Sequence, residues 1–228
     1  MVKQVVGSMS DWSGVLKDFF RQIEDGSHDL ESVKAFNEHQ NPFSLPSDLL
    51  LDWQKFWERM GIGADLRNVK ILKKPKGFDR LLVNPLTPQK AYDLCESKSK
   101  FKCWKYSSES LDKIIFHEDR SAVDGAYAIW VRERVEADEE NKNRSANDLA
   151  KAKFSGITLT ERLVYELKFH DETGKHLDIS NWTLCSGSRD SGGDVPSVGW
   201  SGHDSEMRVS RARPSDAGDG LRSRQVVS

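Results

Sequence analysis

The N-terminal quarter of the chain has the hydrophobic spacing of amphipathic helices. Apolar residues recur every three to four positions through residues 10–24, around residues 30–38 and through residues 47–60, which predicts three helices. Gly26, Asn41-Pro42 and Gly61 are typical helix ends. We therefore expect a helical N-terminal region over residues 1–65.

The middle of the chain combines the three-to-four-residue spacing of helices with segments typical of strands. Thr158 and Glu161 have the spacing of a capping box at the start of a helix, and Gly174 suits its end. The acidic run over residues 133–142 is more typical of a solvated helix face than of a metal site. Strands are predicted at 68–73, 78–83 and 125–132, the last buried on both faces, and helices at 87–94, 107–115, 145–151 and 158–169.

The last part of the chain has an unusual composition. Residues 186–224 contain no Lys, Asn, Thr, Ile, Phe or Tyr, and Ser, Gly and Asp supply more than half of them. This composition alone favours a flexible tail. However, Val198 and Trp200, like Met207 and Val209, have the two-residue spacing of strands. We therefore expect short strands joined by polar loops, and an α+β fold overall.

Composition excludes some functions. The 228 residues suffice for one large domain or for a domain with a helical cap, and the formal net charge of -2 argues against a nucleic-acid partner. No apolar run has the length of a transmembrane helix, so no membrane insertion is expected. The N-terminus does not resemble a secretory signal, which favours the cytoplasm and leaves export by an unconventional route open.

The sequence holds few candidates for catalysis. Cys95, Cys103 and Cys185 lack metal-binding spacing and are expected to be reduced and buried. No zinc, phosphate-loop or nucleophile-elbow motif is present, so neither a metal nor a cofactor is expected. The remaining candidates for an enzyme are the acid–base run at residues 117–119 (His-Glu-Asp) and the thiol of Cys185.

Three segments near the C-terminus carry a family resemblance. Residues 183–189 (Thr-Leu-Cys-Ser-Gly-Ser-Arg), 208–214 (Arg-Val-Ser-Arg-Ala-Arg-Pro) and 220–228 (Gly-Leu-Arg-Ser-Arg-Gln-Val-Val-Ser) resemble the V-L-R-G-G-S-W, C-R-S-A-x-R and G-F-R-V-V motifs of formylglycine-generating-enzyme-like C-type lectin domains. Within that group, residues 187–200 and the ending from Leu221 resemble variable proteins of diversity-generating retroelements. The resemblance implies a C-type-lectin-like domain over residues 66–228, with short mixed or antiparallel strands and helices.

The resemblance also implies a cause for the composition of residues 186–224. In such systems, reverse transcription randomises the adenines of a template copied into the gene, which would deplete Lys, Asn, Thr and Ile together. The catalytic cysteines of the enzyme branch and the motifs of calcium-dependent lectins have no counterpart here. The implied protein is therefore a non-enzymatic ligand-binding protein.

The resemblance divides the C-terminal positions into fixed and variable ones. The fixed positions would hold the fold, namely Gly187, Val195, Pro196, Val198, Trp200, Val209, Leu221, Val226 and Val227. The variable positions would face outward and bind an unknown protein or other surface ligand, namely Asp190, Asp194, Ser197, Gly199, Ser201, His203, Asp204, Arg208, Ser210, Arg211, Arg213, Ser215, Asp216 and Asp219. Two alternatives remain open: an enzyme using the acid–base or thiol candidates, and an assembly protein that oligomerises through its N-terminal helices.

Overall fold

The chain divides into two units. A computed structural model describes residues 9–26, 44–98 and 101–228 and separates residues 1–49 from residues 50–228. The first unit contains helix α1 (Met9–Glu24), as predicted, and the described side chains of Trp12, Leu16 and Phe20 on its apolar stripe are exposed. The helix predicted around residues 30–38 lies outside the described residues.

The boundary between the units differs from the prediction. Helix α3 (Ser44–Arg59) buries Trp53, Phe56 and Trp57 within the second unit. The ammonium of Lys168, on helix α7 (Leu159–Thr173), lies 2.6 Å from the carboxylate of Asp52 and within cation–π distance of Trp53 and Phe56. The boundary between the units thus falls at residues 49 and 50, whereas the predicted one lies at residue 65, because the aromatic face of α3 belongs to the larger core.

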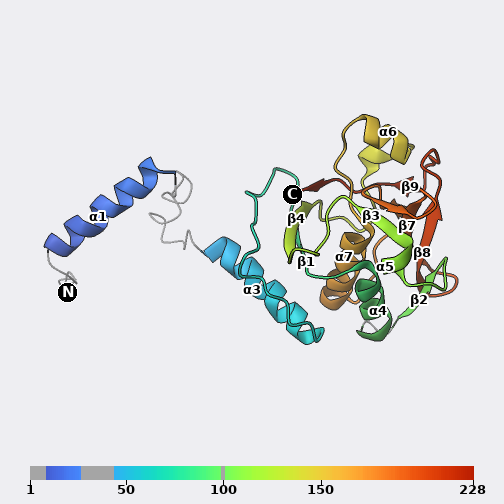
Figure 1. Ribbon diagram of the computed structural model, residues 1–228, viewed down its shortest axis with the longest axis horizontal. Helices are drawn as coiled ribbons and strands as arrows, with labels where there is room; N and C mark the ends of the chain where they lie inside the picture. The colour runs from blue at the N-terminus through green and yellow to red at the C-terminus, as the bar shows by residue number, and fades with distance from the viewer. Residues whose placement is uncertain (1–8, 27–43, 99–100) are drawn as a thin grey trace. The chain divides into compact units, whose positions relative to one another are not determined.

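The second unit has an α+β fold, as predicted, in which helices pack against three small sheets (Figure 1). The first sheet has the antiparallel order β1-β4-β10, and the second has the mixed order β2-β8-β7-β5-β9. The third pairs β3 with β6. The strands are β1 (Arg80–Asn84), β2 (Lys102–Lys105), β3 (Ile115–Glu118), β4 (Tyr127–Val131), β5 (Trp182–Leu184), β6 (Ser188–Asp190), β7 (Val195–Ser201), β8 (Glu206–Ala212), β9 (Leu221–Arg222) and β10 (Val226–Val227).

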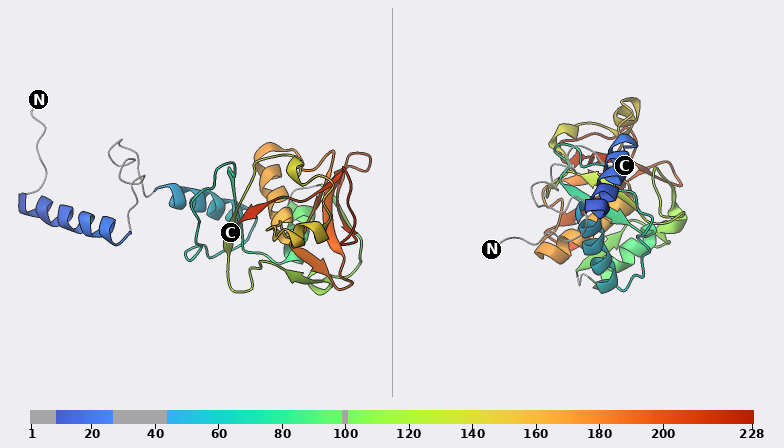
Figure 2. Two further views of the ribbon diagram at one scale, coloured as in Figure 1. Left: turned by 90° about the horizontal axis from the view of Figure 1, so that it is seen from above. Right: turned by 90° about the vertical axis from the view of Figure 1, so that its left-hand side faces the viewer.

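Helix α7 (Leu159–Thr173) is the centre of this unit and contacts both larger sheets (Figures 1 and 2). Its capping box is confirmed: Glu161 N–H donates to Thr158 Oγ1, and Thr158 N–H donates to the Glu161 carboxylate. Gly174 ends the helix with a positive φ of 66°, as predicted. The other helices are α4 (Pro88–Lys98), α5 (Leu111–Ile114) and α6 (Ala146–Lys151), with a 3₁₀ turn η1 at Glu139–Asn141.

Several local predictions were wrong. Residues 68–73 form no strand, and the carbonyl of Leu72 accepts a hydrogen bond from the indole of Trp130 at 2.8 Å. Only Leu111–Ile114 is helical within residues 107–115. The acidic run over residues 133–142 forms no long helix and contains only the turn η1. Arg132 pairs with Asp138 and Arg134 pairs with Glu140, both at 2.6 Å, and these ion pairs hold the backbone as a loop.

The tail is a packed part of the fold. The predicted strand spacings lie in β7 and β8, which form an antiparallel hairpin, and β10 returns to pair with β4. Ser223 and Arg224, between β9 and β10, are buried. Among the described residues, no helix combines the length and the apolar character needed to cross a lipid bilayer.

A buried charge network joins the tail to α7. The Asp178 carboxylate accepts hydrogen bonds from Arg224 Nη2 at 2.7 Å, Arg162 Nε at 2.8 Å and Thr183 Oγ1 at 2.5 Å. Arg162 also donates to Glu166 at 2.9 Å, so the buried charges balance. Burial alone would raise the pKa of Asp178, but Arg224 and Arg162 outweigh it and lower the pKa.

The substitution Asp178→Ala should destabilise the protein strongly. It leaves two buried guanidinium groups without their shared anion, a change that typically costs about 3–5 kcal/mol. Urea unfolding followed by tryptophan fluorescence measures the loss. The matched control Asp124→Ala, at an exposed position, should change the free energy of unfolding by less than about 0.5 kcal/mol. Equal effects of the two substitutions would contradict the role of the network.

Candidate functional site

The five-stranded sheet has an inner and an outer face. Along each strand, the side chains of successive residues point alternately to one face and to the other. Thr183, Val198 and Val209 share the inner face with the buried charge network. The cross-strand partners Trp104, Arg208 and Gly199 share the other side, and we call it the outer face. Helix α6 covers one end of this face through Ala146.

The outer face carries an exposed aromatic and charged group. The Arg208 guanidinium lies 5.6 Å from the ring centroid of Trp104, which is cation–π distance. Arg208 also forms ion pairs with Asp204 and Glu206 at 2.7 Å. The Trp104 side chain is 44% exposed. We call these four residues the Trp104–Arg208 patch.

The loop between β7 and β8 extends this patch. Ser201 Oγ donates to Asp204 at 2.7 Å, and the ring of His203 lies 3.0 Å from the same carboxylate. Two hydrogen bonds lower the pKa of Asp204, and the one from Ser201 has a larger effect than the one from His203. Asp204 therefore stays ionised opposite Arg208 at neutral pH. Ser201, His203, Asp204 and Arg208 are candidate positions that the structure brings together.

A second group of candidate positions lies at the other end of the hairpin. Arg211 is exposed and approaches Asp190 at 3.6 Å and Asp194 at 3.7 Å. Arg211 and Arg208 are three residues apart on β8, about 10 Å along the strand. This odd separation directs the two side chains to opposite faces of the sheet, so this group is separate from the Trp104–Arg208 patch. Arg213, Ser215, Asp216 and Asp219 are exposed in the loop that follows β8, and Ser210 is half-buried on β8.

Asp190 does not face outward, contrary to expectation. One oxygen of its carboxylate accepts the N–H groups of Gly192 and Asp194 at 2.9 Å, and the other accepts the Tyr106 hydroxyl at 3.0 Å. The side chain is 2% exposed. Asp190 organises the turn before β7, so its role is structural.

Ser197 and Gly199 are also buried, contrary to expectation. Both lie on β7, which has a neighbouring strand on each side. The Trp182 ring covers Gly199, where an added Cβ would lie 2.8 Å from Cδ2 of the indole. These two positions shape the sheet and offer little surface to a ligand.

The positions expected to be fixed are mostly interior. Val195, Val198, Val209 and Val226 are buried, as are Gly187 and Pro196. Trp200, Leu221 and Val227 are half-buried. The apolar positions of the tail therefore hold the sheet in place, while most of the polar ones meet solvent.

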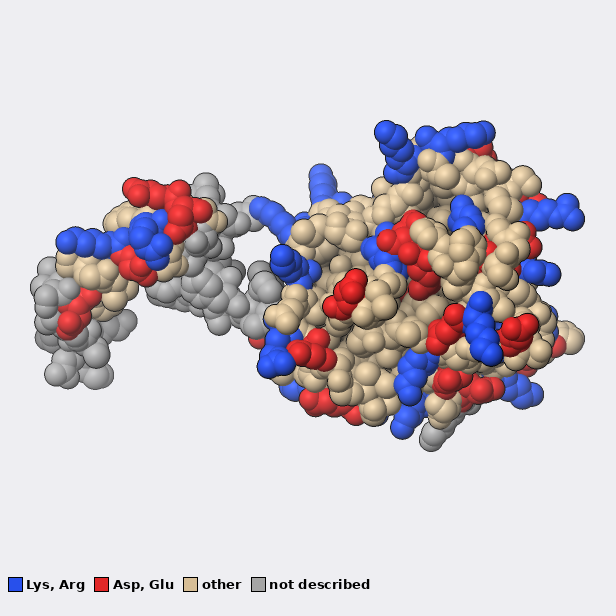
Figure 3. All heavy atoms as spheres, in the orientation of Figure 1, with Lys and Arg blue, Asp and Glu red and all other residues tan. Residues whose placement is uncertain are grey.

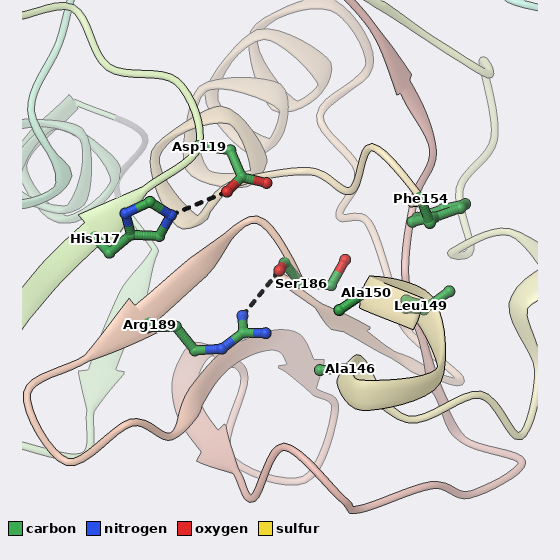
Figure 4. A pocket seen from close by; sticks show the side chains of 8 residues that line it. All are labelled: His117, Asp119, Ala146, Leu149, Ala150, Phe154, Ser186 and Arg189. Atoms are coloured by element: carbon green, nitrogen blue, oxygen red, sulfur yellow. Dashed lines mark hydrogen bonds and ion pairs between the residues drawn. The ribbon is translucent and has the colours of Figure 1, made fainter. Parts of the chain in front are cut away.

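The residues of the alternative catalytic site do not converge. His117 and Asp119 lie 3.0 Å apart on the rim of a cavity of about 280 Å³ (Figure 4). The carboxylate of Glu118 points elsewhere, to Thr160 and to Ser188 at 3.0 Å. Cys185 is fully buried, and burial raises its pKa far above the usual range, so its thiol is an unsuitable nucleophile.

Glu118 is a structural carboxylate with an altered proton affinity. Burial raises its pKa to about 7, against the opposing effect of hydrogen bonds from Thr160 and Ser188. It links β3 to the first turn of α7 and to β6. Within the described ranges, no group of three or more His, Cys, Asp or Glu side chains is arranged to hold a metal ion.

Trp104 and Trp182 were not among the predicted site residues. Both flank the candidate positions on the outer face, but they lie before residues 186–224. The alternation in Lys-Cys-Trp-Lys at residues 102–105 could have predicted a strand. Its parallel pairing with β8, across about a hundred residues, has no local signal.

Comparisons of the chain with known protein families, with curated proteins and with solved structures found no match.

The pH dependence of stability should report on Glu118. Its folded-state pKa of about 7 lies above its ordinary value of 4.5, so its contribution is fully present below pH 4.5 and is lost as the pH rises through 7. We expect the free energy of unfolding to fall by roughly 1–3 kcal/mol over this window. Denaturant unfolding at several pH values measures it. Glu118→Gln should flatten this slope, and the exposed control Glu109→Gln should preserve it.

The substitution Gly199→Ala should disturb the outer face. The new methyl group would displace the Trp182 indole, and such overpacking costs roughly 1–3 kcal/mol. Thermal unfolding and the tryptophan emission maximum would both change. The control Gly202→Ala, in the hairpin loop with no atom within 4 Å of the added Cβ, should leave both nearly unchanged. If the two variants behave alike, Trp182 does not cover Gly199.

Proposed function

We propose that the chain is a non-enzymatic ligand-binding protein on a C-type-lectin-like domain, whose C-terminal surface is diversified by adenine-directed mutagenic retrohoming. One observation carries the proposal. Within residues 186–224, the positions expected to be fixed are mostly buried, and most of the candidate variable positions are exposed or half-exposed. The same segment thus combines interior anchors with replaceable surface.

Hydrogen bonds hold both ends of the segment in the fold, so residues between the two ends can be substituted. At the start of the segment, Gly187 N–H donates to the carbonyl of Ile157 at 3.1 Å. At its end, Arg224 donates to Asp178 and to the carbonyls of Arg134 and Val135. Polar changes on a surface held at both ends leave the core intact, and display on a rigid scaffold limits the entropy lost on binding.

The Trp104–Arg208 patch is the strongest candidate for the centre of the binding surface. An exposed tryptophan beside an arginine is a common centre of protein interfaces. Lys and Arg side chains are interspersed with Asp and Glu over the face seen in Figure 3. That mixture favours a protein or another surface ligand over a nucleic acid.

The alternatives have less support. An enzyme based on His117, Glu118 and Asp119 or on Cys185 lacks a convergent site among these groups. The exposed apolar stripe of α1 suits assembly, but nothing in the described part of the chain shows what covers it.

Sequencing the same locus across related cells tests the proposal. We expect substitutions to concentrate at half-buried or exposed positions such as Arg208, Arg211 and Arg213, and to be absent from Val198 and Val209. A near-repeat template and a reverse-transcriptase gene should lie nearby. A uniform tail without these neighbours would refute diversification. Substitutions spread equally over buried and exposed positions would refute the division into scaffold and display surface.

A further inference from the structure

The cavity beside His117 and Asp119 has two chemically different walls (Figure 4). Leu149, Ala150 and Phe154, on α6 and the segment after it, form an apolar wall together with Ala146. The other wall is polar. The volume of about 280 Å³ lies just below the range of sites for drug-sized ligands, so the cavity suits a smaller molecule.

Arg189 supplies the fixed cation of the polar wall. Its Nη1 donates to the carbonyls of Ser186 at 2.9 Å and Ser188 at 2.7 Å. These bonds hold the guanidinium in place beside Ser186, where Arg189 lines the cavity (Figure 4). Among the described residues, Nε and Nη2 have no protein partner. They form one of the two edges on which a guanidinium binds a carboxylate through paired hydrogen bonds.

The remaining polar groups limit the charge of a ligand. Asp119 places a negative charge on the rim, with His117 Nε2 at 3.0 Å from it. Ser186 shares a hydrogen bond with Ser223 at 2.7 Å. The charges of Arg189 and Asp119 nearly cancel, so the site has no excess positive charge to stabilise a second negative charge on a ligand. One free guanidinium edge therefore suits a monoanion better than a phosphate.

We propose that this cavity binds a small monocarboxylate with a compact aromatic or apolar body. The carboxylate pairs with the free edge of Arg189, and the body lies against Phe154, Leu149 and Ala150. The site uses none of the candidate variable positions, and its failure or success is independent of the proposed display function.

Titration of the full chain with phenylacetate tests the site. A ligand with roughly ten non-hydrogen atoms should bind with a Kd on the order of 1 mM, measured by ligand-observed NMR or calorimetry. The neutral amide phenylacetamide should bind at least tenfold more weakly, because it lacks the charge that Arg189 recognises. Inorganic phosphate should also bind at least tenfold more weakly, because it lacks the apolar body.

Two variants and a control locate the binding. Arg189→Gln should weaken phenylacetate binding at least tenfold, and Ala150→Trp, at an exposed position of α6, should abolish it by filling the cavity. Arg67→Gln, at an exposed arginine that does not line the cavity, should leave it unchanged. If Arg189→Gln fails to fold, the binding of phenylacetate to Ala150→Trp tests the proposal instead. The proposal is overturned by equal binding of the amide or of phosphate, by wild-type affinity in Ala150→Trp, or by no saturable binding of phenylacetate.

Discussion

The buried carboxylate of Asp178 is the constraint on which the second unit depends. It lies between two buried guanidinium groups, one from α7 and one from the segment between β9 and β10. A buried charge is tolerated when opposite charges and hydrogen bonds compensate for its lost hydration. The chain therefore has to bring Arg224 back to α7 after the hairpin, and this return places β10 against β4. The polar tail is ordered because its end is part of the core.

The alternation of a β-strand then separates scaffold from surface. Side chains on the inner face of the five-stranded sheet meet α7 and the charge network, while those on the outer face meet α6 or solvent. Arg208 and Val209 are neighbours in sequence but occupy opposite faces of the sheet. A segment with many Gly, Ser and Asp residues can thus contribute to a core through every second residue and still offer polar side chains to a partner.

Not every polar group near the surface is available to a ligand. Asp190, Glu118 and the Asp178 carboxylate satisfy backbone or side-chain donors inside the fold. Among the described residues of the second unit, two places combine polar groups that keep free hydrogen-bonding capacity or exposed area with apolar or aromatic side chains. One is the Trp104–Arg208 patch, and the other is the cavity at Arg189. The first suits a broad partner surface and the second a small molecule, because one is open and the other is concave.

Local sequence patterns were sufficient to predict the elements that depend on interactions between residues close in sequence. The capping box and terminal glycine of α7, the helix α1 and the strands β7 and β8 follow from spacing and turn residues. Long-range pairing was not accessible in the same way. The parallel contact of β2 with β8 brings Trp104 to Arg208, and the burial of Ser197 and Gly199 follows from strands on both sides of β7. The sequence identified which residues of the tail were polar, whereas the tertiary structure decided which of them meet solvent. The physical reason is that the exposure of a side chain depends on neighbours that are distant in sequence.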